Sequence, residues 1–92
     1  MKKEITKKNI EKYYNITKKA LDIAKRSVSK NQQKKANEII KMVECYLQDS
    51  IYFKDKKDYI NSFGAIYYAH GWIDCGARLK IFNVKDNDLF TV

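Results

Sequence analysis

The sequence predicts an all-α fold: a three-helix up-and-down bundle that forms a single domain. Three observations predict it. A chain of 92 residues is long enough for one domain only. With three glycines and no proline, the chain has too few turn-forming residues for a fold of many strands. Along three successive segments of similar length, apolar residues recur at steps of three and four, which is the spacing of a helix with one buried stripe.

The first two helices are predicted from this spacing and from capping residues. We expect the first over residues 6–27, with Thr6 as its N-cap. We expect the second over residues 30–54, because the spacing from Ser29 to Gln32 fits a capping box. Short connections between helices of matched length favour up-down-up packing.

The third helix is predicted over residues 59–80, with Asp58 as its cap, and it is apolar on nearly all sides. Two neighbouring helices cannot cover both of its faces. We therefore expect the tail, residues 81–92, to pack on this helix, or another subunit to cover its second face. Each glycine in a helix costs about 1 kcal/mol relative to alanine. We expect another backbone, from the tail, a neighbouring helix or a partner, to approach closely at the three glycines, which all lie in this helix: Gly64, Gly71 and Gly76.

Several classes of protein are not favoured by the composition. We find no apolar segment typical of a secretory signal or of a membrane span, and no motif that indicates a cofactor. Cys45, Cys75 and the single His70 cannot supply a four-ligand zinc site, so no metal is expected.

The two cysteines are not expected to form a disulfide. In antiparallel helices the two thiols would lie roughly 10 Å apart along the axis, which is too far for a disulfide. Cys75 is expected to be a small packing residue, and the cysteine usage predicts a cytoplasmic protein.

Two runs in the third helix resemble a known family. Residues 58–65 read DYINSFGA and residues 68–79 read YAHGWIDCGARL, and the closing LFTV of residues 89–92 fits the same pattern. They are similar to domain-of-unknown-function family 357, an archaeal family. The resemblance implies a left-handed three-helix bundle in an archaeal, cytoplasmic protein. It brings no established activity and no catalytic residues. Cys75 stands where the family usually has alanine, which is a conservative difference in volume.

The leading functional hypothesis is a non-enzymatic module for protein interaction or self-association. It depends on the second face of the third helix, which a three-helix monomer does not explain. Trp72 is the candidate anchor of this face, since aromatic side chains dominate binding energy at interfaces. The candidate interaction face is Gly64, Tyr68, Trp72, Cys75 and Leu79.

An alternative hypothesis is nucleic-acid binding through a basic face of the first helix. Residues 1–35 hold 12 basic and 3 acidic residues, net +9, whereas residues 36–92 hold 7 and 8, net −1. Such a surface suits a phosphate backbone or an acidic partner. The basic residues are nearly all lysine and no aromatic side chain lies among them, so a solvated face is the competing interpretation. The candidate contacts are Lys7, Lys8, Lys12, Lys18, Lys19, Lys25 and Arg26.

A third hypothesis places a small-molecule or catalytic site in a polar cluster of the third helix. His70, Asp74 and Arg78 follow at steps of four, so their polar ends can meet on one side of a helix, with Tyr67 beside them. A His–Asp pair oriented by Arg78 could move a proton or bind a small anion. The structural alternative is a polar ladder at the core edge, with His70 bonded to a facing tyrosine or carbonyl. We favour the structural alternative.

Overall fold

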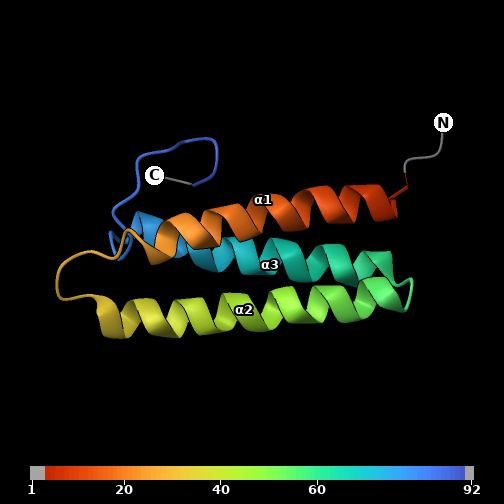
Figure 1. The fold of residues 1–92 in the computed structure, drawn as a ribbon, viewed down its shortest axis with the longest axis horizontal. Coiled ribbons are helices and arrows are strands. Elements are labelled where there is room, and N and C mark those ends of the chain that lie inside the picture. The colour runs from red at the N-terminus through yellow and green to blue at the C-terminus, as the bar shows by residue number, and fades with distance from the viewer. Residues whose placement is uncertain (1–3, 91–92) are drawn as a thin grey trace.

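The computed structural model describes residues 4–90 and contains three helices: α1 (Lys7–Lys25), α2 (Gln33–Asp55) and α3 (Tyr59–Arg78). α1 and α3 run in the same direction, and α2 runs against both (Figure 1). The prediction of an all-α up-and-down bundle is confirmed, with each helix slightly shorter than expected. None of the helices in residues 4–90 has both the length and the apolar character needed to cross a bilayer.

Two of the three predicted caps are present. The Thr6 hydroxyl accepts a hydrogen bond from the Asn9 backbone N–H at 3.2 Å, and the Asn9 side chain accepts one from the Thr6 N–H at 3.1 Å. These reciprocal bonds satisfy two donors that the helix itself leaves unpaired. At α3, the carboxylate of Asp58 accepts from the Asn61 N–H at 3.2 Å.

The capping box predicted at Ser29 is wrong. α2 begins at Gln33, and its N-cap, Gln32, makes no side-chain capping bond. Asn31 takes a left-handed conformation with φ of 65°, which breaks the helical path between Ser29 and Gln32. The Ser29 hydroxyl instead donates to the Lys80 carbonyl at 2.7 Å.

This bond belongs to a short pairing, which we call the strap, between residues 27–29 and 80–83. Ser29 N–H donates to the Ile81 carbonyl at 2.9 Å, and Asn83 N–H donates to the Ser27 carbonyl at 2.6 Å. Between them, Val28 and Phe82 form an isolated antiparallel bridge. The strap fastens the end of α1 to the chain that leaves α3.

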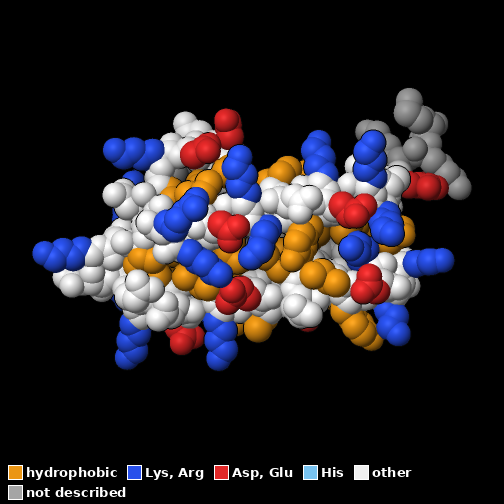
Figure 2. Space-filling model, viewed as in Figure 1, with side chains coloured by type: hydrophobic (Ala, Val, Ile, Leu, Met, Phe, Trp, Pro, Cys, Tyr) orange, Lys and Arg blue, Asp and Glu red, His pale blue; other side chains and the backbone are white. Residues whose placement is uncertain are grey.

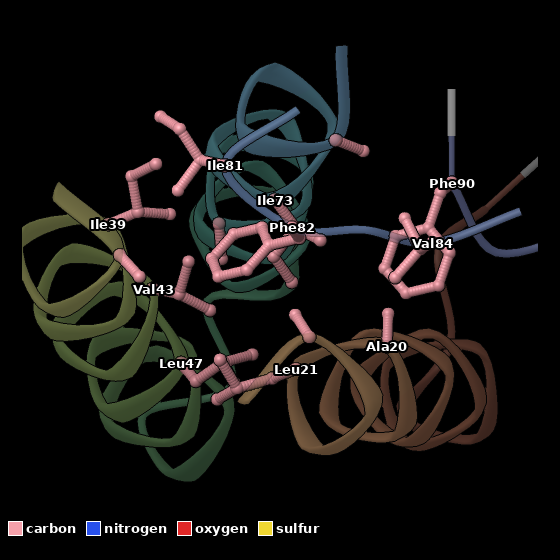
Figure 3. Close-up of a cluster of buried hydrophobic side chains, with 14 residues drawn as sticks. Ala20, Leu21, Ile39, Val43, Leu47, Ile73, Ile81, Phe82, Val84 and Phe90 are labelled. Carbon is pink, nitrogen blue, oxygen red and sulfur yellow. The ribbon is translucent and has the colours of Figure 1, made fainter. Parts of the chain in front are cut away.

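The core receives side chains from all three helices and from the tail. Phe82 lies at its centre, between Ile39 and Val43 of α2, Leu21 of α1 and Ile73 of α3 (Figure 3). The prediction that the tail packs on α3 is therefore confirmed. The buried apolar residues are Ile10, Ala20, Leu21, Ala24, Ala36, Ile39, Val43, Leu47, Ile66, Ala69, Ile73, Ala77, Ile81, Phe82, Val84 and Phe90.

Gly76 makes room for the ring of Phe82. A Cβ atom on Gly76 would lie 2.5 Å from Cε2 and 2.6 Å from Cδ2 of that ring, and 3.2 Å from Cδ1 of Ile39. Phe82 is almost fully buried and cannot swing away. The close approach expected at Gly76 is thus present: the Phe82 ring fills the place of a Cβ atom, and the tail backbone N–H groups of Ile81 and Phe82 donate to the Gly76 carbonyl at 2.9 and 3.2 Å.

Candidate interaction face on α3

α3 has a face that the rest of the chain leaves open, which we call the outer face. Its large side chains are strongly exposed: Ile60 to 77%, Leu79 to 66%, Tyr67 to 60% and Tyr68 to 56%. They share a helix side with two glycines and a half-buried tryptophan. The outer face consists of Ile60, Gly64, Tyr67, Tyr68, Gly71, Trp72, Cys75 and Leu79.

The tail does not cover the outer face. Val84 and Phe90 pack above Ala20 of α1 (Figure 3), and the Leu89 carbonyl accepts a hydrogen bond from Nε2 of His70 at 2.8 Å. From Val84 to Phe90, the tail therefore lies on the α1 side of α3. We expected either the tail or another subunit to cover the second face of this helix. Within the described residues, the tail does not cover it.

Gly64 and Gly71 have no role in the packing of residues 4–90. A Cβ atom built on either glycine would have no neighbour within 4 Å, and neither has a positive φ. Of the three approaches expected at these glycines, neither the tail nor a neighbouring helix supplies one within the described chain, and approach by a partner stays a prediction. Each of the two glycines still costs about 1 kcal/mol of helix stability relative to alanine.

Neighbouring rings hold the two exposed tyrosines in place. The Tyr67 ring lies 4.6 Å from that of Phe63, and the Tyr68 ring lies edge-on to Tyr46 of α2 at 4.6 Å between centroids. Partial burial raises the pKa of the Tyr46 phenol above its ordinary 10.0, and the neighbouring Tyr68 and Asp49 reinforce the shift. Aromatic side chains fixed in this way lose little conformational freedom on binding.

The middle of the outer face is a shallow hollow of about 350 Å³. Tyr67 and Tyr68 stand on one side of Gly71 along the helix, and Trp72 and Cys75 complete the lining. Cys75 is exposed here, so the prediction that it is a packing residue is wrong for the monomer. Both cysteines are free and exposed.

Three members of this face were not predicted from the sequence as part of it: Ile60, Tyr67 and Gly71. All three were detectable, because they lie within about 60° of Gly64 or Cys75 on a helix of 3.6 residues per turn. Tyr67 was instead assigned to the polar cluster.

The structure gives His70 of that polar cluster two structural bonds. Because a carbonyl oxygen only accepts, Nε2 of His70 donates to Leu89, and in the neutral ring Nδ1 accepts from the hydroxyl of the buried Thr17 at 2.9 Å. The ring thereby joins α1, α3 and the tail. The nearest carboxylate oxygen of Asp74 lies 3.8 Å from Nε2.

The remaining members of the cluster are more loosely placed. Arg78 is exposed. Tyr67 lines a second hollow, of about 260 Å³, which reaches His70 between α1 and α3. Within residues 4–90, no group of three or more His, Cys, Asp and Glu side chains is placed to hold a metal ion.

The predicted basic face lies on the solvent side of α1. Acidic residues are interspersed with its lysines: Lys18 lies 3.6 Å from Asp22, and Lys25 lies 2.9 Å from Glu44 of α2. Figure 2 shows the same mixture of basic and acidic side chains on the side of the molecule in view. Four exposed basic residues with no ion pair among the described residues lie along one edge of the helix and its C-cap: Lys8, Lys12, Lys19 and Arg26.

Comparison with known families agrees with the resemblance in α3. The profile of a family described as "Protein of unknown function (DUF357)" matches residues 12–82, which includes all of α2 and α3. The chain belongs to this family. Neither a search of curated proteins nor one of solved structures gave a significant match.

Proposed function

We propose that this member of a family of unknown function is a non-enzymatic module that self-associates through the outer face of α3. One observation carries the proposal. Gly64 and Gly71 weaken the helix by about 1 kcal/mol each, and no described residue packs into the space that a Cβ atom on either of them would take. Glycines on an exposed helix face allow a second backbone to approach closely.

The side chains around the glycines support the same function. Four large apolar or aromatic residues with more than half of their surface exposed lie along one helix, and the hollow of about 350 Å³ lies between them. Isolated exposed apolar residues are normal on a protein surface, whereas a continuous apolar strip is typical of an interaction site. Trp72, partly buried at the edge of the hollow, is the anchor residue of the proposal.

The proposal assigns no catalytic step to the polar cluster. His70 makes one bond to a buried hydroxyl and another to the tail, so its two nitrogens are already used in holding the fold. A group that must exchange protons with a substrate needs at least one nitrogen within reach of it.

Sedimentation analysis with a matched pair of variants tests the proposal. Tyr68 on α3 and Tyr52 on α2 are similarly exposed, at 56% and 59%. We expect the unmodified chain to form an oligomer, Tyr68→Lys to be a monomer, and Tyr52→Lys to retain the oligomer. A chain that remains monomeric at every concentration would contradict the proposal, and so would equal losses in both variants.

The charge distribution favours nucleic-acid binding as a second candidate function. α1 and the segment after it, residues 7–32, hold 8 basic and 2 acidic residues, net +6, and the edge of Lys8, Lys12, Lys19 and Arg26 could follow a phosphate backbone. Fluorescence anisotropy with labelled RNA and duplex DNA tests it. Lys8→Glu combined with Lys19→Glu should weaken binding far more than the same charge change at Lys56 and Lys57.

Salt separates the two candidate functions. Phosphate contacts release counterions, so nucleic-acid affinity falls steeply as salt rises. Two copies of a chain with net charge +8 repel each other, and salt screens this repulsion, so self-association should strengthen. Measuring the affinity of each complex at increasing salt therefore shows whether binding depends on the basic edge of α1 or on the outer face of α3.

A further inference from the structure

A hollow of about 250 Å³ lies between α1 and α2, away from the outer face, and we call it the α1–α2 hollow. Because α2 runs against α1, the first turns of α1 lie beside the last turns of α2 (Figure 1). These two helices share the least extensive contact of any helix pair. The lining of the hollow includes Ile10, Glu11, Tyr14, Ser50, Ile51 and Lys54.

The floor of the α1–α2 hollow is apolar, and one small residue leaves room above it. Ser50 continues the buried stripe of α2 after Val43 and Leu47, which carry larger apolar side chains. Its hydroxyl donates to the Leu47 carbonyl at 2.6 Å and so already has a partner. The buried Ile10 of α1 and the half-buried Ile51 of α2 supply apolar surface. The floor therefore suits an apolar group of a ligand.

Two opposite charges line the same hollow without pairing. Glu11 is exposed on α1 and Lys54 is half-buried on α2, and neither makes an ion pair with any residue of the described range 4–90. Partial burial of an ammonium group without a carboxylate partner is unfavourable. A ligand that carries both a carboxylate and an ammonium group would give each side chain a partner.

A neighbouring hollow between the same two helices differs in this respect. It has a volume of about 170 Å³, shares Tyr14 with the α1–α2 hollow, and is lined by two charged side chains, Lys18 and Glu44. Both are paired within the chain: Nζ of Lys18 lies 3.6 Å from a carboxylate oxygen of Asp22, and Nζ of Lys25 lies 2.9 Å from one of Glu44. Among the described residues, the charges are therefore paired at one hollow and unpaired at the other.

We propose that the α1–α2 hollow binds a free α-amino acid with an apolar side chain. The ammonium group of the ligand pairs with Glu11, its carboxylate pairs with Lys54, and its side chain lies against the floor. A volume of about 250 Å³ is below the roughly 300–1,000 Å³ of sites for drug-sized ligands, so it suits a smaller molecule such as this one. The site is separate from the outer face, so it neither requires nor excludes self-association.

Titration of the isotope-labelled chain with L-leucine, followed by nuclear magnetic resonance, tests the proposal. We expect saturable shifts of the amide signals around Glu11 and Lys54, with little change around Lys18 and Glu44. Two analogues each lack one charge: N-acetyl-leucine has no ammonium group, and leucinamide has no carboxylate. Each should bind about fivefold or more weakly than leucine, which is the loss expected for an ion pair at a partly exposed site.

Two variants match each charge of the ligand to its side chain. In Glu11→Gln the ammonium group has no partner, so leucine should bind as weakly as N-acetyl-leucine. In Lys54→Gln the carboxylate has no partner, so leucine should bind as weakly as leucinamide. Lys18→Gln and Glu44→Gln remove charges from the neighbouring hollow and should bind leucine as the unmodified chain does. Circular dichroism checks that all four variants are folded.

Four results would overturn the inference. They are the absence of saturable shifts with leucine, shifts centred away from the α1–α2 hollow, equal binding of leucine and both analogues by the unmodified chain, and equal losses in the control variants. The last result would show that the net charge of the chain, and not the hollow, governs binding. None of them bears on self-association, which sedimentation measures separately.

Discussion

Gly76 on the inner face of α3 and Gly71 on its outer face lie little more than one helical turn apart, yet their surroundings are opposite. Gly76 lies under the Phe82 ring, and a methyl group there would clash with it. A methyl group on Gly71 would meet nothing. A methyl group on Gly64, two turns earlier in the helix, would likewise meet no described atom within 4 Å.

The difference separates two reasons for a glycine in a helix. At Gly76, the cost in helix stability is offset within the chain, because a large aromatic ring fills the core through the space left by the missing Cβ. At Gly64 and Gly71, no contact in the described monomer offsets the cost. Natural chains tolerate such local costs mainly where function requires them. The contrast therefore directs attention to what lies outside the monomer.

Removing the ring over Gly76 should have the largest effect. Phe82 is almost fully buried at the centre of the core, so Phe82→Ala should lower the free energy of unfolding by about 3–5 kcal/mol. Urea denaturation measures the change. A loss below about 1 kcal/mol would mean that the ring is not the central packing element, since even one buried methylene contributes nearly that much.

Adding a methyl group under the ring should have the next largest effect. Gly76→Ala gains helix propensity but overpacks the core, and overpacking costs typically about 1–3 kcal/mol. We expect a net loss of stability in thermal or urea unfolding. Combining it with Phe82→Leu should recover part of that loss, because the smaller side chain leaves room. Stabilisation by Gly76→Ala alone would remove the contrast between the two glycines.

The same substitution on the outer face should act in the opposite direction. Gly71→Ala should raise the free energy of unfolding of the monomer by about 0.5–1 kcal/mol, since only the helix-propensity term changes. Under the proposed function, it should also weaken self-association, measured by dilution in the ultracentrifuge. Greater stability together with unchanged association would show that the glycine is not at the interface.

The smallest effect concerns the ring contact between Tyr46 and Tyr68. Burial, assisted by Tyr68 and Asp49, raises the pKa of Tyr46 in the folded chain above 10.0, so the unfolded chain loses this proton first. The stability linked to Tyr46 is therefore present below pH 10 and falls as the pH rises from there to the raised value. Absorbance titration of the tyrosines should show a late component that Tyr46→Phe removes. Identical curves for the two chains would contradict the shift.

Patterns local to the sequence predict much of this molecule. Steps of three and four place the three helices, Thr6 and Asp58 begin two of them, and the helical spacing separates the two faces of α3. The strap was not predictable in this way, because Ser29 bonds to Lys80, which is 51 residues away. For the same reason, the bonding of His70 to Thr17 and Leu89 depends on packing between segments far apart in the chain. Helical spacing places Gly76 on a different side of α3 from Gly64 and Gly71, but the contact between Gly76 and the Phe82 ring was not predictable from the sequence.

The strap also bears on the order in which the protein assembles. α2 and α3 share the most extensive contact of any helix pair and are joined by only three residues, 56–58, so this hairpin can form early with little loss of chain entropy. The strap closes a much longer loop, so α1 is expected to dock last and to detach first. In native-state hydrogen exchange, the amides of Ser29 and Asn83 would then open together, at a lower free energy than those in the middle of α2. In such a protein, α2 and α3 form a stable helical hairpin from which α1 can detach.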